Sequence, residues 1–208
     1  MGSFSTAIVV GASSGIGEAM VRKLVRQGCK VAAIARRKEE LDRLQKELGA
    51  QLLPYPHDVL HFEETAALFD QIVRDLGGLD LLIYNAGIMP KVEDNEYNFT
   101  KNRQMIEVNL IGAMAWMDPA AAYMEARRAG TLVGISSVAG DRGRRKNPGY
   151  HASKAGFSTY LESLRNRLTQ YNVRVVTVKP GPVKTSMTQG EKLPLMVDAE
   201  TCAEGALA

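Results

Sequence analysis

Three side chains near residue 150 have the types and the spacing for proton transfer. Tyr150 precedes Lys154 by four residues, and Ser137 lies thirteen residues before the tyrosine. On a helix, side chains four residues apart project from the same face, so the Lys154 ammonium would lie near the Tyr150 phenol. A tyrosine with its ordinary pKa of about 10 is a poor base at neutral pH, but a neighbouring cation favours the phenolate. The spacing therefore predicts a tyrosine that exchanges a proton with a substrate.

A glycine-rich segment near the start of the chain could hold a nucleotide. Apolar residues 7–10 predict a buried strand, a helical pattern begins near residue 17, and the segment between them reads Gly11, Ala12, Ser13, Ser14, Gly15, Ile16, Gly17. Glycine permits a tight turn and a close backbone approach to a diphosphate, and the free amides of a helix start attract negative charge. The glycine spacing differs from the most frequent dinucleotide fingerprint, and such a turn can also be a plain strand-to-helix corner.

The elements that must position these residues alternate along the chain. Apolar runs predict strands, and between them lie helical patterns such as residues 62–76; the predicted strands are 7–10, 31–35, 52–55, 79–84, 131–135 and 173–178. The run at 52–55 contains Pro54, which weakens it as a strand. The alternation predicts the α/β class, with a doubly wound, mostly parallel, Rossmann-like sheet in a three-layer α/β/α arrangement. Ligands are expected at the carboxyl ends of the strands, where Ser137 would also lie.

Length and composition predict a single domain over residues 1–208. The chain has 45% hydrophobic residues and a net charge of +3, which is too small to argue for nucleic acid. We expect no membrane span, because no apolar stretch approaches about 20 residues, and no secretory signal, because residues 1–6 lack its pattern. The two cysteines, Cys29 and Cys202, predict neither a disulfide framework nor a metal cluster, which favours a cytoplasmic location. No metal is expected at His57 and His61, which we interpret as surface residues.

Taken together, the motifs resemble those of the short-chain dehydrogenase/reductase family, in its compact single-domain branch. The resemblance runs from about residue 6 to about residue 190 and rests on these motifs in this order: the glycine-rich segment 11–17, Asp58-Val59, Asn85-Ala86-Gly87, Asn109, Ser136-Ser137, Tyr150 through Lys154, and residues 180–185. Val10 and Tyr84 depart from the usual threonine and asparagine of the family. Neither departure removes a group that the chemistry needs.

The resemblance implies a role for each residue of the catalytic set. Tyr150 would be the general acid in reduction and the general base in oxidation, and Ser137 would hydrogen-bond the substrate oxygen. Lys154 would also bind the nicotinamide ribose. Asn109 would hold a water that links Lys154 to solvent, although a buried asparagine could instead merely satisfy backbone groups. Ser136 is a weaker candidate, because strand alternation turns it away from Ser137.

The residues after the second predicted strand bear on cofactor choice. A carboxylate at this position of the fold binds the adenosine ribose, whereas a basic residue accommodates a 2′-phosphate. Here Arg36 and Arg37 follow Ala35, so NADP(H) is favoured over NAD(H), with Arg36 especially suited to bind phosphate and stack on adenine. Both arginines could instead be solvated residues. The remaining expected cofactor contacts are Asp58 and Val59 at the adenine, Asn85, Ala86 and Gly87 at the ribose, and Pro180, Gly181, Val183 and Thr185 at the nicotinamide.

The sequence says less about substrate and assembly. A basic segment, residues 142–146, would lie near the mouth of the site, where it could steer an anionic substrate, be solvated, or contact another subunit. The family predicts a homodimer or homotetramer. The candidate apolar contacts, which could equally be core, are Trp116, Phe157, Leu161, Leu164 and Leu168. Residues 198–208 predict the start of a helix without the further strand that family members usually have.

Three functions compete on these grounds. The favoured one is an NADP-dependent enzyme that reduces a small-molecule ketone or aldehyde to an alcohol, or catalyses the reverse. The second is a dinucleotide sensor without turnover, for which the set of Ser137, Tyr150 and Lys154 would have no use. The third is an epimerase or dehydratase on the same scaffold. Relatives of that third kind usually have a larger substrate region and another glycine spacing.

Overall fold

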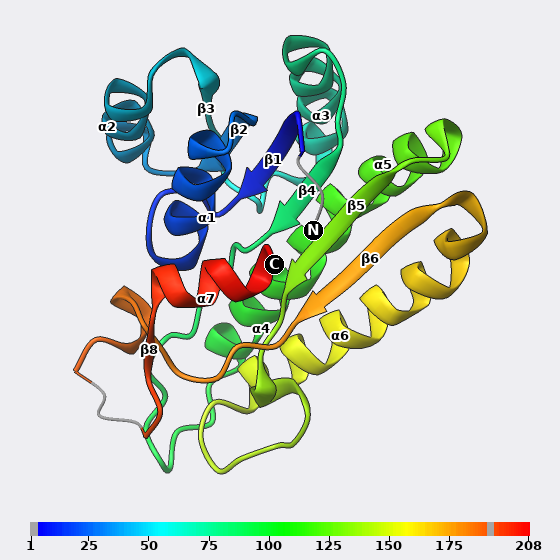
Figure 1. Ribbon diagram of the computed structural model, residues 1–208. Coiled ribbons are helices and arrows are strands. Elements are labelled where there is room, and N and C mark those ends of the chain that lie inside the picture. Colours follow the sequence, from blue (N-terminus) through cyan, green and yellow to red (C-terminus); the bar gives the residue numbers. More distant parts are fainter. Residues whose placement is uncertain (1–3, 191–193) are drawn as a thin grey trace.

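The fold is built around one parallel β-sheet. A computed structural model describes residues 4–190 and 194–208, so Met1 and its two neighbours, part of the segment judged above to lack a secretory signal, lie outside the described residues (Figure 1). Within the described residues the main sheet has six strands in the order β3-β2-β1-β4-β5-β6. Their bounds are β1 Thr6–Val10, β2 Lys30–Ala35, β3 Leu52–Pro56, β4 Leu81–Tyr84, β5 Gly130–Ile135 and β6 Val173–Val178.

Helices cover both faces of this sheet (Figure 1). The helices of the described residues are α1 Gly15–Arg26, α2 Lys38–Leu48, α3 Phe62–Leu76, α4 Phe99–Ile106, α5 Gly112–Arg127, α6 Pro148–Leu168 and α7 Ala199–Ala206. Buried side chains of α1, α2 and α7 pack on one face, and those of α3, α5 and α6 pack on the other. The predicted doubly wound α/β fold is confirmed, and the order of strands reverses between β1 and β4.

Side-chain alternation along β1 shows why the sheet is buried on both sides. Ile8 and Val10 belong to the cluster under α3, α5 and α6, whereas Ala7 and Val9 belong to the cluster under α1, α2 and α7. All four are fully buried. A strand covered on both faces reads as a continuous apolar run, which is the pattern that predicted it.

The proline-containing strand is placed at an edge. Among the described residues, β3 pairs in parallel with β2 alone, with Pro54 opposite Ala33. An edge strand tolerates the missing N–H of proline because one side of the strand has no ladder partner to satisfy. The predicted third strand is therefore confirmed.

Several short elements were not predicted. β7 (Val183–Lys184) pairs in parallel with β8 (Val197–Asp198), and both are only two residues long. A π-helical turn, Glu107–Ile111, joins α4 to α5. Elements this short have no periodicity from which a sequence pattern could reveal them.

The apolar residues considered for subunit contacts are core residues. Trp116, Phe157, Leu161 and Leu168 are fully buried within the chain, and Leu164 is 5% exposed. They pack under the sheet with residues of α3 and α5. Their interpretation as intersubunit contacts is wrong, because a side chain covered by its own chain cannot contact another copy.

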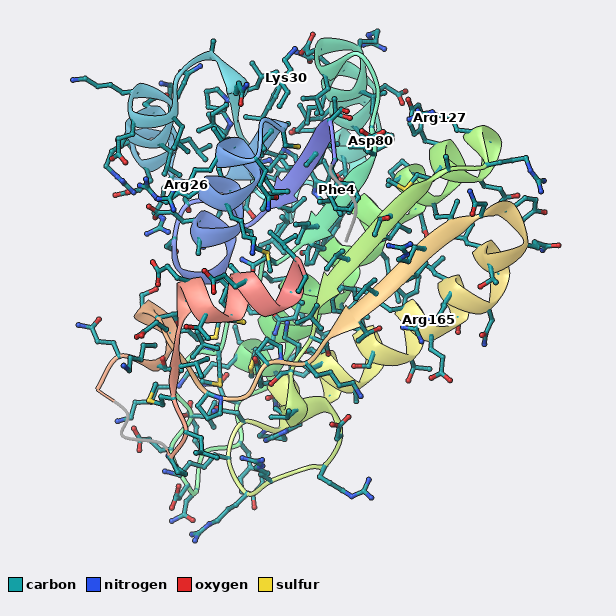
Figure 2. The ribbon with its side chains drawn as sticks, in the orientation of Figure 1. Phe4, Arg26, Lys30, Asp80, Arg127 and Arg165 are labelled. Carbon is teal, nitrogen blue, oxygen red and sulfur yellow. The ribbon has the colours of Figure 1, made fainter. Side chains whose placement is uncertain are left out.

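Polar contacts hold the amino ends of the strands, at the opposite end from the expected site (Figure 2). The Asp80 carboxylate accepts from the backbone amides of Ser5 at 3.0 Å and Thr6 at 3.2 Å. Arg127 of α5 donates to the Leu79 carbonyl at 2.8 Å. These bonds satisfy backbone groups at the amino ends of the strands. In this fold the carboxyl ends of the strands are the ends that bind ligands.

Among the helices of residues 4–190 and 194–208, none has both the length and the apolar character that crossing a membrane requires.

Candidate active site

The carboxyl ends of the strands open into a pocket of about 1100 Å³. This volume slightly exceeds the usual range of about 300–1000 Å³ for small-ligand sites, so a dinucleotide and a second molecule can share the pocket. Most of the residues predicted for the site line it: Gly11, Ser13, Ser14, Gly15, Ile16, Arg36, Arg37, Asp58, Val59, Asn85, Ala86, Gly87, Ser137, Tyr150, Lys154, Pro180, Gly181, Val183 and Thr185. Gly17 and Asn109 lie behind its wall, both buried.

The glycine-rich turn fits against β4 only because it lacks side chains. Gly11 has φ of +85°, and a Cβ there would lie 2.5 Å from the Ala86 nitrogen. A Cβ on Gly17 would lie 2.1 Å from the Gly11 carbonyl oxygen. The side chain of Asn85 completes this contact by donating to the same oxygen at 2.9 Å. Gly17 therefore lets α1 pack closely against the turn.

Arg37 reaches across to the two serines of the turn. Its guanidinium donates to Ser13 Oγ at 2.9 Å and to Ser14 Oγ at 2.7 Å. Ser14 is also the residue just before α1, whose first amides point toward the pocket end of the helix. A guanidinium, two hydroxyls and a helix start together form a group of donors suited to an anion.

Arg36 lies on the other side of this group, toward Asp58. Its guanidinium is 3.8 Å from the Asp58 carboxylate, and its side chain is 64% exposed. Arg36 and Arg37 are both predicted cofactor contacts, with Arg36 especially suited to bind the phosphate. In the structure Arg37, and not Arg36, contacts the serines of the turn, while Arg36 lies beside Asp58 and Val59 at the expected adenine position.

Ser137 and Tyr150 meet at the pocket wall. Ser137 follows β5 and begins a short 3₁₀ turn, where its Oγ accepts from the Ala139 amide at 3.1 Å. Because that bond uses a lone pair, the hydroxyl hydrogen remains free to be donated. Tyr150 is in the first turn of α6, and its phenol lines the same pocket, where the Ser137 side chain acts to lower the pKa of the phenol.

Lys154 is buried one turn further along α6. The residue is 4% exposed. Its Nζ donates a 2.8 Å hydrogen bond to the carbonyl of Ile135, the last residue of β5. Nζ lies 5.9 Å from the centroid of the Tyr150 ring. The predicted helical pairing of the two residues is therefore present, with the cation beside the ring.

The electrostatics of this pair differ from the expectation. Burial raises the pKa of Tyr150, and the Ser137 hydroxyl opposes that rise only in part. Burial lowers the pKa of Lys154 to about 8. The predicted shift toward the phenolate is not found in the chain alone, because desolvation outweighs the nearby donor. A protonated phenol at neutral pH is the form that can act as an acid.

Ser136 turns away from this group, as strand alternation predicts. Its hydroxyl donates to the Lys154 carbonyl at 3.0 Å and shares a 2.8 Å hydrogen bond with Ser158 Oγ. It therefore fastens β5 to α6 rather than facing a substrate.

Asn109 is fully buried in the π-helical turn. Its Oδ1 accepts from the Ile88 amide at 2.7 Å, and its Nδ2 donates to the Ile88 carbonyl and to Ser153 Oγ, both at 3.0 Å. The asparagine thus satisfies buried backbone groups, which was one of the two alternatives. It also lies near Lys154 across Gly87, where a Cβ would be 3.4 Å from Asn109 Oδ1 and 3.6 Å from Lys154 Nζ.

Tyr84, one of the two departures from the family pattern, supports this turn. It is fully buried at the end of β4, and its hydroxyl donates to the Val108 carbonyl at 2.6 Å. A π-helical turn disrupts the regular ladder of an α-helix, so a side-chain donor is useful there. Tyr84 therefore helps to hold the backbone next to Asn109.

We expect Tyr84→Phe to lower the free energy of unfolding by about 0.5–1.5 kcal/mol, because it removes a hydrogen bond between two buried groups. Urea denaturation followed by circular dichroism measures the change. Tyr55→Phe is the matched control, since the Tyr55 hydroxyl bonds the Asp75 carboxylate in an exposed position. Equal effects of the two variants would contradict the role given to Tyr84.

His57 departs from its prediction as a surface residue. It is 7% exposed, lines the pocket beside Asp58, and packs edge-on against Trp116 with 5.8 Å between ring centroids. One nitrogen or oxygen from each of His57, His61 and Glu64 falls within 4.8 Å of the others. Burial lowers the pKa of His57, so its imidazole is neutral at pH 7. The apolar stripe of α3 could be predicted from its spacing. A single histidine before that helix belongs to no such pattern, so the sequence does not indicate that it is buried.

The pocket lining also includes residues that the sequence did not predict. Val138, Met187 and Asn147 line the pocket, and the Asn147 Oδ1 is buried without a hydrogen-bond partner among the described residues. None belongs to a regular pattern, because loops that converge on a pocket are ordered by tertiary contacts and not by periodicity.

A parallel sheet that reverses at β1 and β4, with a glycine-rich turn opening onto a pocket at that point, defines a Rossmann-like dinucleotide-binding domain. The chain belongs to the short chain dehydrogenase family, whose sequence model matches residues 5–194. It is 37% identical over 202 residues to an uncharacterized oxidoreductase of Myxococcus xanthus, covering 96% of this chain and 80% of that protein. An uncharacterized oxidoreductase of Mycobacterium tuberculosis is 35% identical over 207 residues, covering 93% and 79%. The chain is thus an oxidoreductase of this family.

Solved structures show the same arrangement. A short-chain dehydrogenase from Streptomyces avermitilis aligns with a TM-score of 0.88 at 25% identity, covering 98% of this chain and 82% of that one. A short-chain dehydrogenase from Burkholderia cenocepacia J2315, solved in complex with NADP, aligns with a TM-score of 0.87 at 25% identity, covering 99% and 84%.

Proposed function

We propose that this protein is an NADP(H)-dependent oxidoreductase that reduces a ketone or aldehyde to an alcohol, or catalyses the reverse. The observation that carries the proposal is that Ser137, Tyr150 and Lys154 line one pocket, with the buried Lys154 Nζ 5.9 Å from the centroid of the Tyr150 ring. Ser137 and Tyr150 present a hydroxyl and a protonated phenol to this pocket. Such a pair can bind a substrate oxygen and transfer a proton to it.

The residues around the turn fit a nicotinamide dinucleotide. Gly11 and Gly17 allow the turn to approach β4 more closely than any residue with a Cβ. The start of α1 would bind the diphosphate, and Arg37 with Ser13 and Ser14 would bind a 2′-phosphate. Asp58 and Val59 would hold the adenine beside Arg36. The Burkholderia relative solved with NADP supports this choice of cofactor.

Each catalytic residue then has one task. The cofactor supplies or accepts the hydride. Tyr150 donates its phenol proton to the substrate oxygen in reduction and takes it back in oxidation. Ser137 donates a hydrogen bond to the same oxygen and so stabilises the charge that develops there. Lys154 binds the nicotinamide ribose. The second lone pair of Asn109 Oδ1 is the site proposed for a water that links Lys154 to solvent.

An NADPH-oxidation assay with a panel of ketones, aldehydes and quinones tests the proposal. Turnover of at least one carbonyl class, and a preference for NADPH over NADH, are the expected results. Tight NADPH binding without turnover of any compound would instead favour a dinucleotide sensor.

We expect kcat/KM for carbonyl reduction to fall as the pH rises above about 8. The pKa of Lys154 is about 8, so the ammonium is charged below that pH and becomes neutral above it. The loss of this cation weakens ribose binding and the proton supply to Tyr150. Initial rates between pH 6 and 10, with the NADPH dissociation constant measured at each pH, check the prediction because kcat/KM reports groups of the free enzyme. A profile that stays flat to pH 10 would contradict it.

A further inference from the structure

The charges that line the pocket are distributed unevenly. Asp58 is the only carboxylate among the described residues of the lining, and it lies 3.8 Å from Arg36 at the expected adenine end. Around Tyr150, at the other end, the lining instead includes Arg144 and Lys146. The catalytic end of the pocket is therefore basic.

Most of the cations in the basic segment are already engaged. Arg142 donates to the Asp141 carbonyl at 2.9 Å, and Arg145 and Lys146 lie 3.4 Å and 3.2 Å from the carboxylate of Asp94. Arg144 lines the pocket, and no carboxylate or carbonyl among residues 4–190 and 194–208 pairs with its guanidinium. Among the described residues of the lining, this guanidinium is thus a cation at the catalytic end that has no counter-charge.

The walls next to the reacting point are apolar. Val138 follows Ser137 directly, and Met187 lies two residues after Thr185; both line the pocket and both are 39% exposed. Half-exposed apolar side chains at a pocket wall suit the carbon skeleton of a ligand. A ligand that complements both the apolar walls and the guanidinium at the catalytic end would have an apolar body and an anionic group that lies at the rim of the pocket.

We propose that the substrate is a carbonyl compound with an apolar body and an anionic oxygen group, a carboxylate or a phosphate, which Arg144 binds at the pocket mouth. The inference rests on the proposed carbonyl reduction, whose site it specifies further. The planar guanidinium can bind either anion through two parallel hydrogen bonds. The apolar walls would receive the part of the molecule between the carbonyl and the anion.

Three aromatic aldehydes with the same reacting group test this class. They are para-formylbenzoate, its methyl ester, and para-formylphenyl phosphate, each assayed by NADPH oxidation. We expect at least one of the two anions to exceed the neutral ester in kcat/KM, mainly through a lower KM, and the better anion identifies the group. In about 1 M salt, where charges are screened beyond about 3 Å, this preference should shrink.

Two variants assign the preference to one side chain. Arg144→Gln should reduce the ratio of anion to ester in kcat/KM about tenfold, because a charge-assisted hydrogen bond is lost. Arg145→Gln is the matched control, since it removes a neighbouring guanidinium that pairs with Asp94 and lies outside the pocket lining. That control should leave the ratio within about twofold, as expected for an exposed ion pair.

A binding measurement separates this inference from the proposed function. Calorimetric titration of the NADPH-loaded protein with the same three compounds gives the ratio without turnover. Arg144-dependent binding of an anion, with no turnover of these aldehydes or of any compound in the carbonyl panel, would keep the anion site at Arg144 and overturn the proposed reduction. Equal binding of anions and ester in the unsubstituted protein, or a ratio unchanged in Arg144→Gln, would overturn the inference and leave Arg144 as a solvated residue.

Discussion

Replacing Tyr150 by phenylalanine is expected to lower kcat/KM for carbonyl reduction about 10³-fold, within the usual range for loss of a general acid. The phenol is the proposed proton donor at the pocket wall that it shares with Ser137, and burial raises its pKa so that it is protonated at neutral pH. Phenylalanine keeps the ring and removes only the hydroxyl. Initial rates of NADPH oxidation with the best carbonyl substrate measure the effect.

Tyr160→Phe is the matched control for this variant. Tyr160 is on the same helix, α6, and its hydroxyl bonds the exposed Asp118 carboxylate. We expect that control to keep its activity, and both variants to bind NADPH with dissociation constants within about threefold of the original, as expected when neither hydroxyl binds the cofactor phosphates. More than a tenth of the original kcat/KM in Tyr150→Phe would contradict the proposed acid.

Replacing Arg37 by glutamine is expected to weaken NADPH binding about 10- to 100-fold, since a hydrogen bond to a charged group contributes about 1.5–3 kcal/mol. Arg37 is the guanidinium that contacts Ser13 and Ser14, where the 2′-phosphate would lie. NADH has no such phosphate, so its affinity should change little. Fluorescence titration with both dinucleotides gives the two dissociation constants.

Arg36→Gln separates the two neighbouring arginines. Arg36 lies beside Asp58 and is largely exposed, so its loss should affect both dinucleotides by a similar, smaller factor. A larger loss of NADPH affinity in Arg36→Gln than in Arg37→Gln would reverse the assignment and restore Arg36 as the phosphate ligand.

The parts of the fold with strong periodicity could be predicted from the sequence. Continuous apolar runs indicated the strands, and the stripe along residues 62–76 indicated α3, whose bounds are Phe62–Leu76. These patterns are informative because burial on two faces of a strand, or one face of a helix, leaves a regular trace. The pocket was predictable for a related reason: parallel strands bring their carboxyl ends to one edge, whatever the loops between them do.

What could not be predicted depends on contacts between distant segments. Tyr84 and the π-helical turn meet through one hydrogen bond that no spacing encodes. The serines of the turn are contacted by Arg37 and not by Arg36. The backbone conformation just after β2 decides which of the two guanidinium groups faces them. The pKa of Tyr150 rises because burial is a property of the assembled pocket, whereas the sequence showed only the neighbouring lysine.

The separation of Arg37 and its two serines from Tyr150 has a practical consequence. The groups that would select the dinucleotide belong to the β1–α1 turn and the end of β2, whereas the proton-transfer pair belongs to β5 and α6. Engineers could therefore exchange one coenzyme for another by redesigning a few surface side chains, while the reaction centre stays intact. The same separation would let natural variants change their preference between NADPH and NADH without a change in the proton-transfer pair.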